Sequence, residues 1–96
     1  MSVVVAGVGM IPFSTPRAGG TYDDMGAEAA RRALADAGIG IADVAQAYAG
    51  YVYADSAAGQ TALYGLGPTG IPVINVNNWC ASGSTALWLG RQAILS

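Results

Sequence analysis

The chain alternates short apolar runs with polar or glycine-rich breaks over its 96 residues. The first run, Ser2–Val8, is β-branched and bounded by glycine, which is typical of a strand covered on both faces. The glycines and prolines of Gly9–Gly20 predict a loop. Two later runs, near Ala45–Tyr53 and Pro72–Val76, predict a second and a third strand because they are rich in aromatic or β-branched residues.

Helix signals fall between and after these strands. Thr21 is a suitable N-cap for a helix over Tyr22–Ala37, and Asp24 completes a variant of the capping box. Gly38 is expected to end that helix, because glycine readily adopts the left-handed conformation at the C′ position. A short second helix is predicted over Gly59–Leu66, before a Gly-Pro pair stops it.

A last helix is expected to begin close to Cys80 and to continue through Ala93. No stop signal follows, so we expect the chain to end inside this helix at Ser96. The resulting order, β-α-β-α-β-α, predicts an α/β fold with a largely parallel sheet. No linker or internal repeat divides residues 1–96.

Charged side chains are scarce, at 10% of the residues, and the net charge is −2. The four arginines form no basic stripe, so we expect no nucleic-acid partner. The chain has no lysine, which excludes Schiff-base and Walker-type chemistry from its own residues. It also has no histidine, so catalysis of the Ser–His or Cys–His type would need a base from elsewhere.

The stretch Ser56–Gly90 carries no charged side chain at all. A membrane span does not explain it, because prolines and asparagines interrupt every apolar run well short of about 18 residues. A buried strand or a large subunit interface explains it better, since charges are costly to desolvate. The opening MSVVVAGVGM lacks a basic n-region, so we expect no secretory signal and a cytoplasmic location. One cysteine without histidine also excludes an internal disulfide and the common zinc patterns.

The sequence contains neither a dinucleotide-binding glycine motif nor a serine-hydrolase motif. Gly7-Val8-Gly9 follows a predicted strand, but the third glycine of a dinucleotide-binding GxGxxG would stand at Pro12. A tight chain reversal explains these glycines better. A serine-hydrolase GxSxG centred on Ser82 would need glycine at Cys80, so that motif is absent too.

Cys80 is the strongest candidate for chemistry. A single cysteine is more often an inert, buried small side chain. This one follows a predicted strand across the polar turn Asn77-Asn78-Trp79 and stands where a helix begins. The helix dipole and unpaired amides favour a thiolate there, and the same amides can stabilise an oxyanion beside the sulfur. The residues that follow are small and leave room for an acyl group: Ala81, Ser82, Gly83 and Ser84.

The segment Gly70–Leu87, GIPVINVNNWCASGSTAL, resembles the active-site cysteine motif of the thiolases. It is most similar to the sterol-carrier-protein type, whose members are also called lipid-transfer proteins or acetyl-CoA acetyltransferases. The stretches GVGMIPFS at Gly7–Ser14 and YADSAAGQTALYGLG at Tyr53–Gly67 resemble the same family. The resemblance covers essentially the whole chain but about the first quarter of a typical member. It implies that residues 1–96 are an incomplete N-terminal portion of a thiolase-like N-terminal domain.

The resemblance implies covalent acyl transfer through Cys80, which would cleave a 3-oxoacyl-CoA or run the reverse Claisen condensation. The backbone amide of Cys80 would donate to the oxyanion, and Asn77 and Gly83 would support the loop. Coenzyme A and acyl-CoA would be substrates, with no bound cofactor or metal. The family also implies a homodimer through the strand at Val73–Asn77.

The family's activating histidines and second cysteine have no counterpart in this sequence, so the chain alone is expected to be inactive. An alternative is therefore an inactive interaction or lipid-transfer module. A further alternative is another reaction of the same fold, a decarboxylating condensation or a retro-aldol cleavage. The presence of Cys80 favours thiolysis over the retro-aldolases, which need no cysteine at that position.

Overall fold

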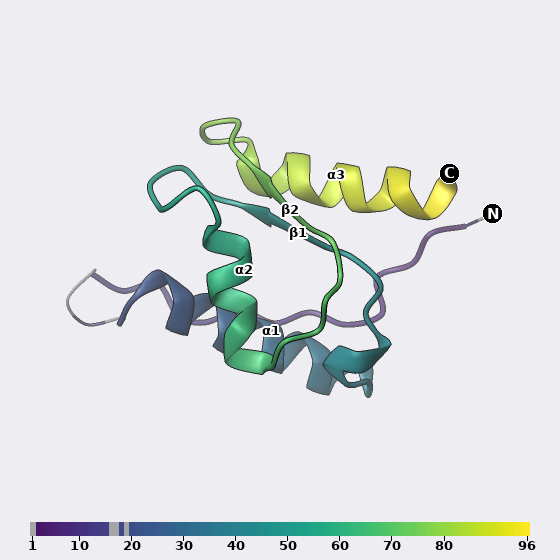
Figure 1. Ribbon diagram of the computed structural model, residues 1–96, viewed down its shortest axis with the longest axis horizontal. Coiled ribbons are helices and arrows are strands. Elements are labelled where there is room, and N and C mark those ends of the chain that lie inside the picture. The colour runs from purple at the N-terminus through teal and green to yellow at the C-terminus, as the bar shows by residue number, and fades with distance from the viewer. Residues whose placement is uncertain (1, 16–17, 19) are drawn as a thin grey trace.

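The computed structural model describes residues 2–15, 18 and 20–96 and shows a small α/β arrangement (Figure 1). It contains three α-helices, two strands and two 3-10 turns. In chain order these are α1 (Tyr22–Ala37), η1 (Ile41–Asp43), β1 (Ala47–Gly50), α2 (Ala58–Leu63), η2 (Tyr64–Leu66), β2 (Val73–Val76) and α3 (Ser82–Leu95). No described helix has the length and apolar character that crossing a bilayer requires.

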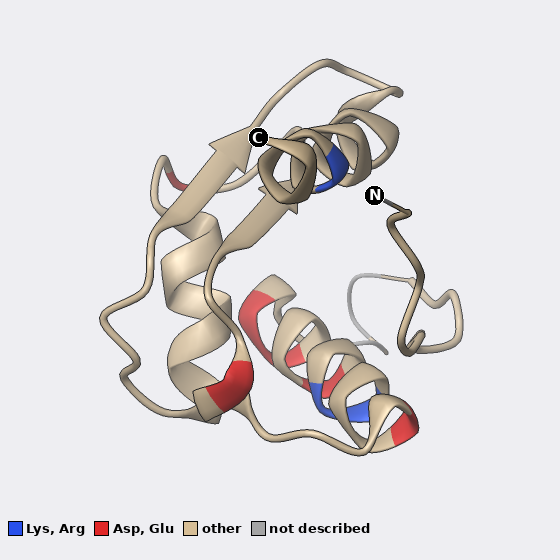
Figure 2. Cartoon of the chain, turned by 90° about the vertical axis from the view of Figure 1, so that its right-hand side faces the viewer, with Lys and Arg blue, Asp and Glu red and all other residues tan. Residues whose placement is uncertain are grey.

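The two strands form a parallel pair, with Ala47 opposite Val73 and Gly50 opposite Val76. The helix α2 connects them, so β1, α2 and β2 form one crossover unit, the connection that parallel strands require. The helices α2 and α3 cover opposite faces of the sheet, and α1 packs against α2 on the side away from α3 (Figures 1 and 2). The parallel α/β class predicted from the element order is confirmed for this part of the fold.

The described core is built from small side chains. Its buried apolar residues are Ala27, Ala58, Val76 and Ala86. Close backbone approach accompanies them: a Cβ added at Gly59 would lie 2.8 Å from the Cβ of Ala49. Alanine and glycine thus allow the helices to pack tightly against the sheet and against each other.

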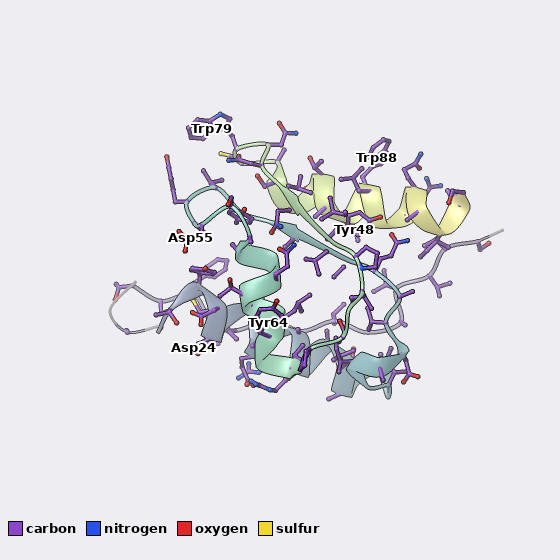
Figure 3. All side chains as sticks on the ribbon, in the orientation of Figure 1. Asp24, Tyr48, Asp55, Tyr64, Trp79 and Trp88 are labelled. Atoms are coloured by element: carbon purple, nitrogen blue, oxygen red, sulfur yellow. The ribbon has the colours of Figure 1, made fainter. Side chains whose placement is uncertain are left out.

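Ile74 and Val76, at alternate positions of β2, are covered to different extents. Val76 is 9% exposed, but Ile74 is 43% exposed. Side chains at these alternate positions share one face of the strand. The helix α3 lies on that face, but it packs mainly over β1 rather than β2, so the start of β2 keeps part of its surface uncovered. Trp79 and Trp88 are also largely exposed, at 68% and 55% (Figure 3).

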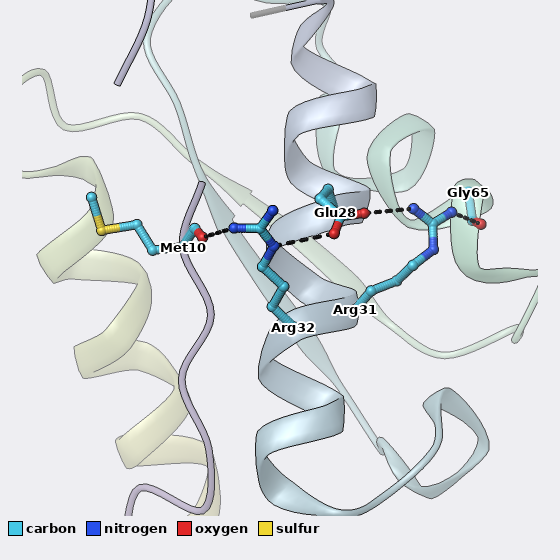
Figure 4. A network of polar contacts seen from close by, with 5 residues as sticks. All are labelled: Met10, Glu28, Arg31, Arg32 and Gly65. Atoms are coloured by element: carbon cyan, nitrogen blue, oxygen red, sulfur yellow. Dashed lines mark hydrogen bonds and ion pairs between the residues drawn. The ribbon is translucent and has the colours of Figure 1, made fainter. Parts of the chain in front are cut away.

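The prediction of a strand over Ser2–Val8 is wrong: these residues form no strand and pair with neither β1 nor β2. The neighbouring backbone bonds to α1 instead. The Val8 amide donates to Asp36 Oδ2 at 2.9 Å, and Arg32 Nη1 donates to the Met10 carbonyl at 2.9 Å (Figure 4). The sheet therefore has the order β1-β2 without an N-terminal strand, which corrects the expected β-α-β-α-β-α order.

The helix α1 has the bounds that the sequence predicts. Thr21 is the N-cap in an extended conformation, and Gly38 is the C-cap at φ 74°, with its own amide and that of Ile39 bonded to the last turn. The Thr21 hydroxyl donates to Asp24 Oδ2 at 3.0 Å rather than capping a backbone amide. The same hydroxyl can instead be directed at Asp23, and a hydrogen bond in that arrangement is the main cause that lowers the pKa of Asp23 from its ordinary value of 3.8.

The charged face of α1 ties neighbouring segments to the helix. Glu28 pairs with Arg31 at 3.5 Å and with Arg32 at 3.1 Å, both in exposed positions where ion pairs add little stability. Arg31 Nη2 also donates to the Gly65 carbonyl at 2.8 Å (Figure 4). The predicted loop Gly9–Gly20 has no helix or strand among its described residues; Pro16, Arg17 and Gly19 lie outside them.

Candidate active site

Cys80 lies in a short turn between β2 and α3, which we call the cysteine turn (Asn77–Ala81). The helix begins at Ser82 with Ala81 as its N-cap, so Cys80 stands just before the helix, where the sequence predicted it. The residue is exposed and is a free cysteine. Its side chain is therefore presented at the protein surface, beside the N-terminal end of α3.

The cysteine turn contains an unusual backbone conformation. Trp79 has φ 47°, and it is the one non-glycine residue with positive φ in the described part of the chain. Its amide donates to Asn77 Oδ1 at 3.2 Å. The amides of Ala81 and Ser82 donate to the carbonyls of Asn78 and Trp79 at 3.0 and 3.1 Å. The turn is closed by its own residues, which reverses the chain immediately before the thiol.

Ser82 makes two further bonds to this turn from the first helical position. Its Oγ accepts the Asn78 amide at 2.7 Å and donates to the Trp79 carbonyl at 2.7 Å. The residue is 4% exposed and is the one buried polar residue among those described. The sequence pattern identified Ser82 only as a small residue. A serine beside a predicted helix start was the available signal, because serine side chains commonly bond to the backbone there.

A second polar cluster anchors the strand that leads into the turn. Asn75 Oδ1 accepts the Gly59 amide at 2.7 Å, and Asn75 Nδ2 donates to Gln60 Oε1 at 2.7 Å. These bonds join the middle of β2 to the start of α2. Nothing in the sequence identified this pair, because the two residues are separated by fifteen positions and the family resemblance assigned neither of them a role.

The sheet and α3 also approach each other closely at the turn. A Cβ added at Gly50 would lie 2.5 Å from the Ser82 carbonyl oxygen and 2.9 Å from the Gly83 amide nitrogen. A Cβ on Gly83 itself would meet no atom of the described chain within 4 Å. The end of β1 therefore packs directly against the first turn of the helix that follows Cys80.

The side chains around Cys80 offer aromatic surface rather than charge. The rings of Tyr53 and Trp79 meet edge to face, with centroids 6.3 Å apart and an interplanar angle of 81°. Most charged residues lie on α1, away from this turn (Figure 2). No group of metal-binding residues occurs in the described part of the chain. A proton acceptor or donor of the histidine type is absent because the sequence has no histidine.

Two cavities lie outside the cysteine turn. One of about 550 Å³ lies between the N-terminal loop, α1 and α2, and includes Asp23 and Arg31. Another of about 1010 Å³ lies between the N-terminal segment, α1, β1 and α3. Gly83 lines the second cavity, but Cys80 lines neither.

Comparison with known proteins gives a consistent result. The model of the family "Thiolase, N-terminal domain" matches residues 3–96. The chain is 56% identical over 94 residues to sterol carrier protein 2 of Gallus gallus and 55% identical over 95 residues to that of Homo sapiens, covering 96% of this chain in each case. It is 48% identical over 96 residues to non-specific lipid-transfer protein-like 2 of Caenorhabditis elegans, covering 98% of this chain. The chain spans only 17% of the two sterol carrier proteins and 23% of the nematode protein.

Proposed function

Because the chain belongs to the thiolase family, we propose that it supplies the nucleophile, Cys80, of an acyltransferase that cleaves 3-oxoacyl-CoA. The observation that carries this proposal is the cysteine turn. An exposed thiol follows a strand, stands beside the start of α3, and is preceded by a residue with left-handed backbone. A helix start supplies the positive end of a dipole and unpaired amides, which stabilise a developing oxyanion.

In the proposed reaction the Cys80 thiolate attacks the C3 carbonyl carbon, and the carbonyl π electrons move onto oxygen as the carbon–sulfur bond forms. The oxyanion then collapses. The C2–C3 bond breaks, its electron pair stays on C2, and protonation of C2 releases acetyl-CoA. The shortened acyl group remains on sulfur as a thioester. A second CoA, after losing its thiol proton, attacks this thioester, and Cys80 leaves as the thiolate.

The groups that move protons in both half-reactions must come from outside these 96 residues, because the sequence has no histidine and no second cysteine. The chain alone is therefore expected to be inactive. Its own contributions are the thiol and the Cys80 amide, which would donate to the oxyanion. Asn77 would act as a support of the loop, consistent with its bond to the Trp79 amide. Gly83 would leave space in the first turn of α3, where an added Cβ would meet nothing beyond its own helix.

We further propose that the protein acts in the cytoplasm as a homodimer through Val73–Asn77. Within the described sheet β2 is an edge strand, and Ile74 is 43% exposed in a stretch without charged side chains. An unpaired apolar edge favours association with another strand. Coenzyme A and acyl-CoA would be substrates, so no tightly bound cofactor is required.

The test uses the intact protein with acetoacetyl-CoA and CoA as substrates. Cys80→Ala should lower the rate of thiolysis by at least about 10⁴-fold, as removal of a covalent nucleophile does in other enzymes. Mass spectrometry of the wild-type protein, trapped by acid after mixing with acetoacetyl-CoA alone, should find an acetyl group on the peptide that contains Cys80. Thiolysis that survives in Cys80→Ala, with no acyl group on Cys80, would refute the proposed function.

An inactive lipid-binding or interaction role is the second candidate, because the chain itself lacks histidine and exposes Val4, Val5 and Leu87. Another reaction on the same fold, such as a decarboxylating condensation, would retain Cys80 acylation. The substrates separate these possibilities. Transfer of a fluorescent lipid between vesicles without any acylation of Cys80 would favour the first, and acylation without CoA-dependent release would favour the second.

A further inference from the structure

Ser82 has an arrangement that its position in the helix does not require. The N-cap of α3 is Ala81, and no side chain caps the helix amides. The Ser82 hydroxyl is instead directed back into the cysteine turn, where it bonds to the Asn78 amide and the Trp79 carbonyl, each at 2.7 Å. A hydroxyl that is 4% exposed and satisfied as both donor and acceptor holds a defined position.

The Ser82 hydroxyl bonds to Trp79, whose backbone conformation is strained. A tryptophan at φ 47° lies in the left-handed region, which side chains other than glycine, asparagine and aspartate rarely adopt. Such a conformation persists when surrounding contacts over-determine it. Here the Trp79 amide bonds to Asn77, and its carbonyl receives bonds from both the amide and the hydroxyl of Ser82.

The Trp79 carbonyl matters because it shares a peptide unit with the Cys80 amide. The unit is planar and trans, so the N–H points opposite to the C=O. A group that fixes the direction of the Trp79 carbonyl therefore fixes the direction of the Cys80 N–H. We propose that Ser82 is a positioning residue that aims the Cys80 amide at the oxyanion of the acyl-transfer reaction. This inference rests on the proposed function of Cys80.

Ser82→Ala removes the hydroxyl. The Trp79 carbonyl then keeps one partner, the backbone amide of residue 82. Complete loss of an oxyanion donor costs roughly 10²–10³ in kcat, so a misdirected amide should cost about 10- to 100-fold. Alkylation of Cys80 by iodoacetamide displaces iodide from carbon and forms no oxyanion. Its rate should therefore change much less than kcat.

The experiment compares these two rates in the intact protein. Steady-state thiolysis of acetoacetyl-CoA gives kcat, and mass spectrometry of the Cys80 peptide gives the alkylation rate. Ser84→Ala is the matched control: it makes the same chemical change one half-turn away, at an exposed position whose hydroxyl has no bond within the described chain. Ser82→Ala should lower the ratio of kcat to alkylation rate by about 10- to 100-fold. Ser84→Ala should leave it unchanged, and Ser82→Thr, which keeps the hydroxyl, should restore most of it.

A folded Ser82→Ala protein with a lower melting temperature but an unchanged ratio would overturn the inference and leave Ser82 a merely structural role. Failure of the proposed function is distinguishable, because then Cys80→Ala itself would retain activity. If Ser82→Ala does not fold, the comparison is made in the Trp79→Gly background, since glycine adopts positive φ without steric cost. There Ser82→Ala should still lower the ratio of kcat to alkylation rate relative to Trp79→Gly alone, because the carbonyl of residue 79 loses the same hydroxyl partner. An unchanged ratio in a folded Trp79→Gly/Ser82→Ala protein would also overturn the inference.

Discussion

The cysteine turn and the N-terminal segment (Ser2–Met10) flank the same two-stranded sheet but are held in opposite ways. Hydrogen bonds in the cysteine turn join residues two, three and four positions apart. The bonds of the N-terminal segment to α1 join residues 28 and 22 positions apart. The turn is therefore determined by its own sequence, whereas the segment depends on a partner that another part of the chain must supply.

This difference explains why the sequence predicted the position of the cysteine turn correctly but predicted a strand at Ser2–Val8 that does not form. A turn, a cap or a helix start can be predicted from a few adjacent residues, because local contacts carry little loop-closure entropy. A β-branched run such as Ser2–Val8 shows only that a strand is compatible with the sequence. Whether its amides find a sheet edge or a helix side chain is decided by distant residues, here Asp36 and Arg32.

The largest expected effect comes from adding a side chain at Gly50, where the end of β1 packs directly against the first turn of α3. In Gly50→Ala the new methyl group would meet the Ser82 carbonyl and the Gly83 amide, which are backbone atoms and cannot rotate away. We expect a loss of about 1–3 kcal/mol in the free energy of unfolding. The rate of Cys80 alkylation in the intact protein should change as well.

Gly9→Ala is the counterpart in the N-terminal segment, where a methyl group would meet the backbone of Ala29 and Ala33 on α1. It should destabilise the protein by a comparable amount yet leave Cys80 alkylation at the wild-type rate. Equal changes of the alkylation rate in the two variants would show that the two regions are coupled and would contradict the comparison.

The next prediction tests whether Asn77, in the turn itself, restrains Trp79 independently of Ser82 at the start of α3. Asn77→Ala removes the acceptor of the Trp79 amide, and the free energy of unfolding should fall by about 1 kcal/mol. Because the left-handed Trp79 loses a restraint, its amide should exchange with solvent faster, as hydrogen-exchange mass spectrometry can measure. Asn78→Asp is a suitable control, because it keeps the size of the side chain and leaves the bond between the Trp79 amide and Asn77 in place. Unchanged exchange at Trp79 in Asn77→Ala would assign the turn geometry to Ser82 alone.

A smaller effect is expected in the N-terminal segment. Asp36→Ala removes the acceptor of the exposed Val8 amide, and the free energy of unfolding should fall by about 0.5 kcal/mol. Amide exchange should increase at Val8 but not in the cysteine turn. Increased exchange in the turn would mean that the long-range contacts of the segment support Cys80 after all.

The smallest effect is electrostatic and lies at the start of α1. Thr21→Ala removes the hydroxyl that lowers the pKa of Asp23, so that pKa should rise toward 3.8. A lowered carboxyl pKa stabilises the fold above the unfolded-state value, and this stabilisation disappears as the pH falls through the folded-state value. Wild type and Thr21→Ala should therefore differ in stability above about pH 4 and converge in stronger acid, to a first approximation. An NMR titration of labelled aspartates checks the shift directly.

The elements that could be predicted from the sequence are those with local signals. Thr21 and Gly38 mark the ends of α1, the Gly-Pro pair follows η2, and α3 begins just beyond Cys80. The exposure of Ile74 could not be predicted, because it depends on which strand α3 crosses. The roles of Asn75 and Ser82 were also not apparent, since a polar side chain inside a strand or at a helix start gives no indication of the partner it will find. The position of Cys80 was predictable, and its proposed chemistry rests on the family to which the chain belongs.

The close packing of glycine against backbone and small side chains has a consequence for how this chain tolerates mutation. Among the described residues, an added Cβ would come within 3 Å of another atom at six glycines, and only one buried apolar side chain, Val76, is larger than alanine. The six are Gly7, Gly9, Gly26, Gly50, Gly59 and Gly65. In a library of all single substitutions the positions under the strongest purifying selection for folding should thus be glycines and alanines. Larger apolar residues such as Tyr64, at 69% exposed, should accept many replacements, the reverse of the profile of a domain built around large core side chains.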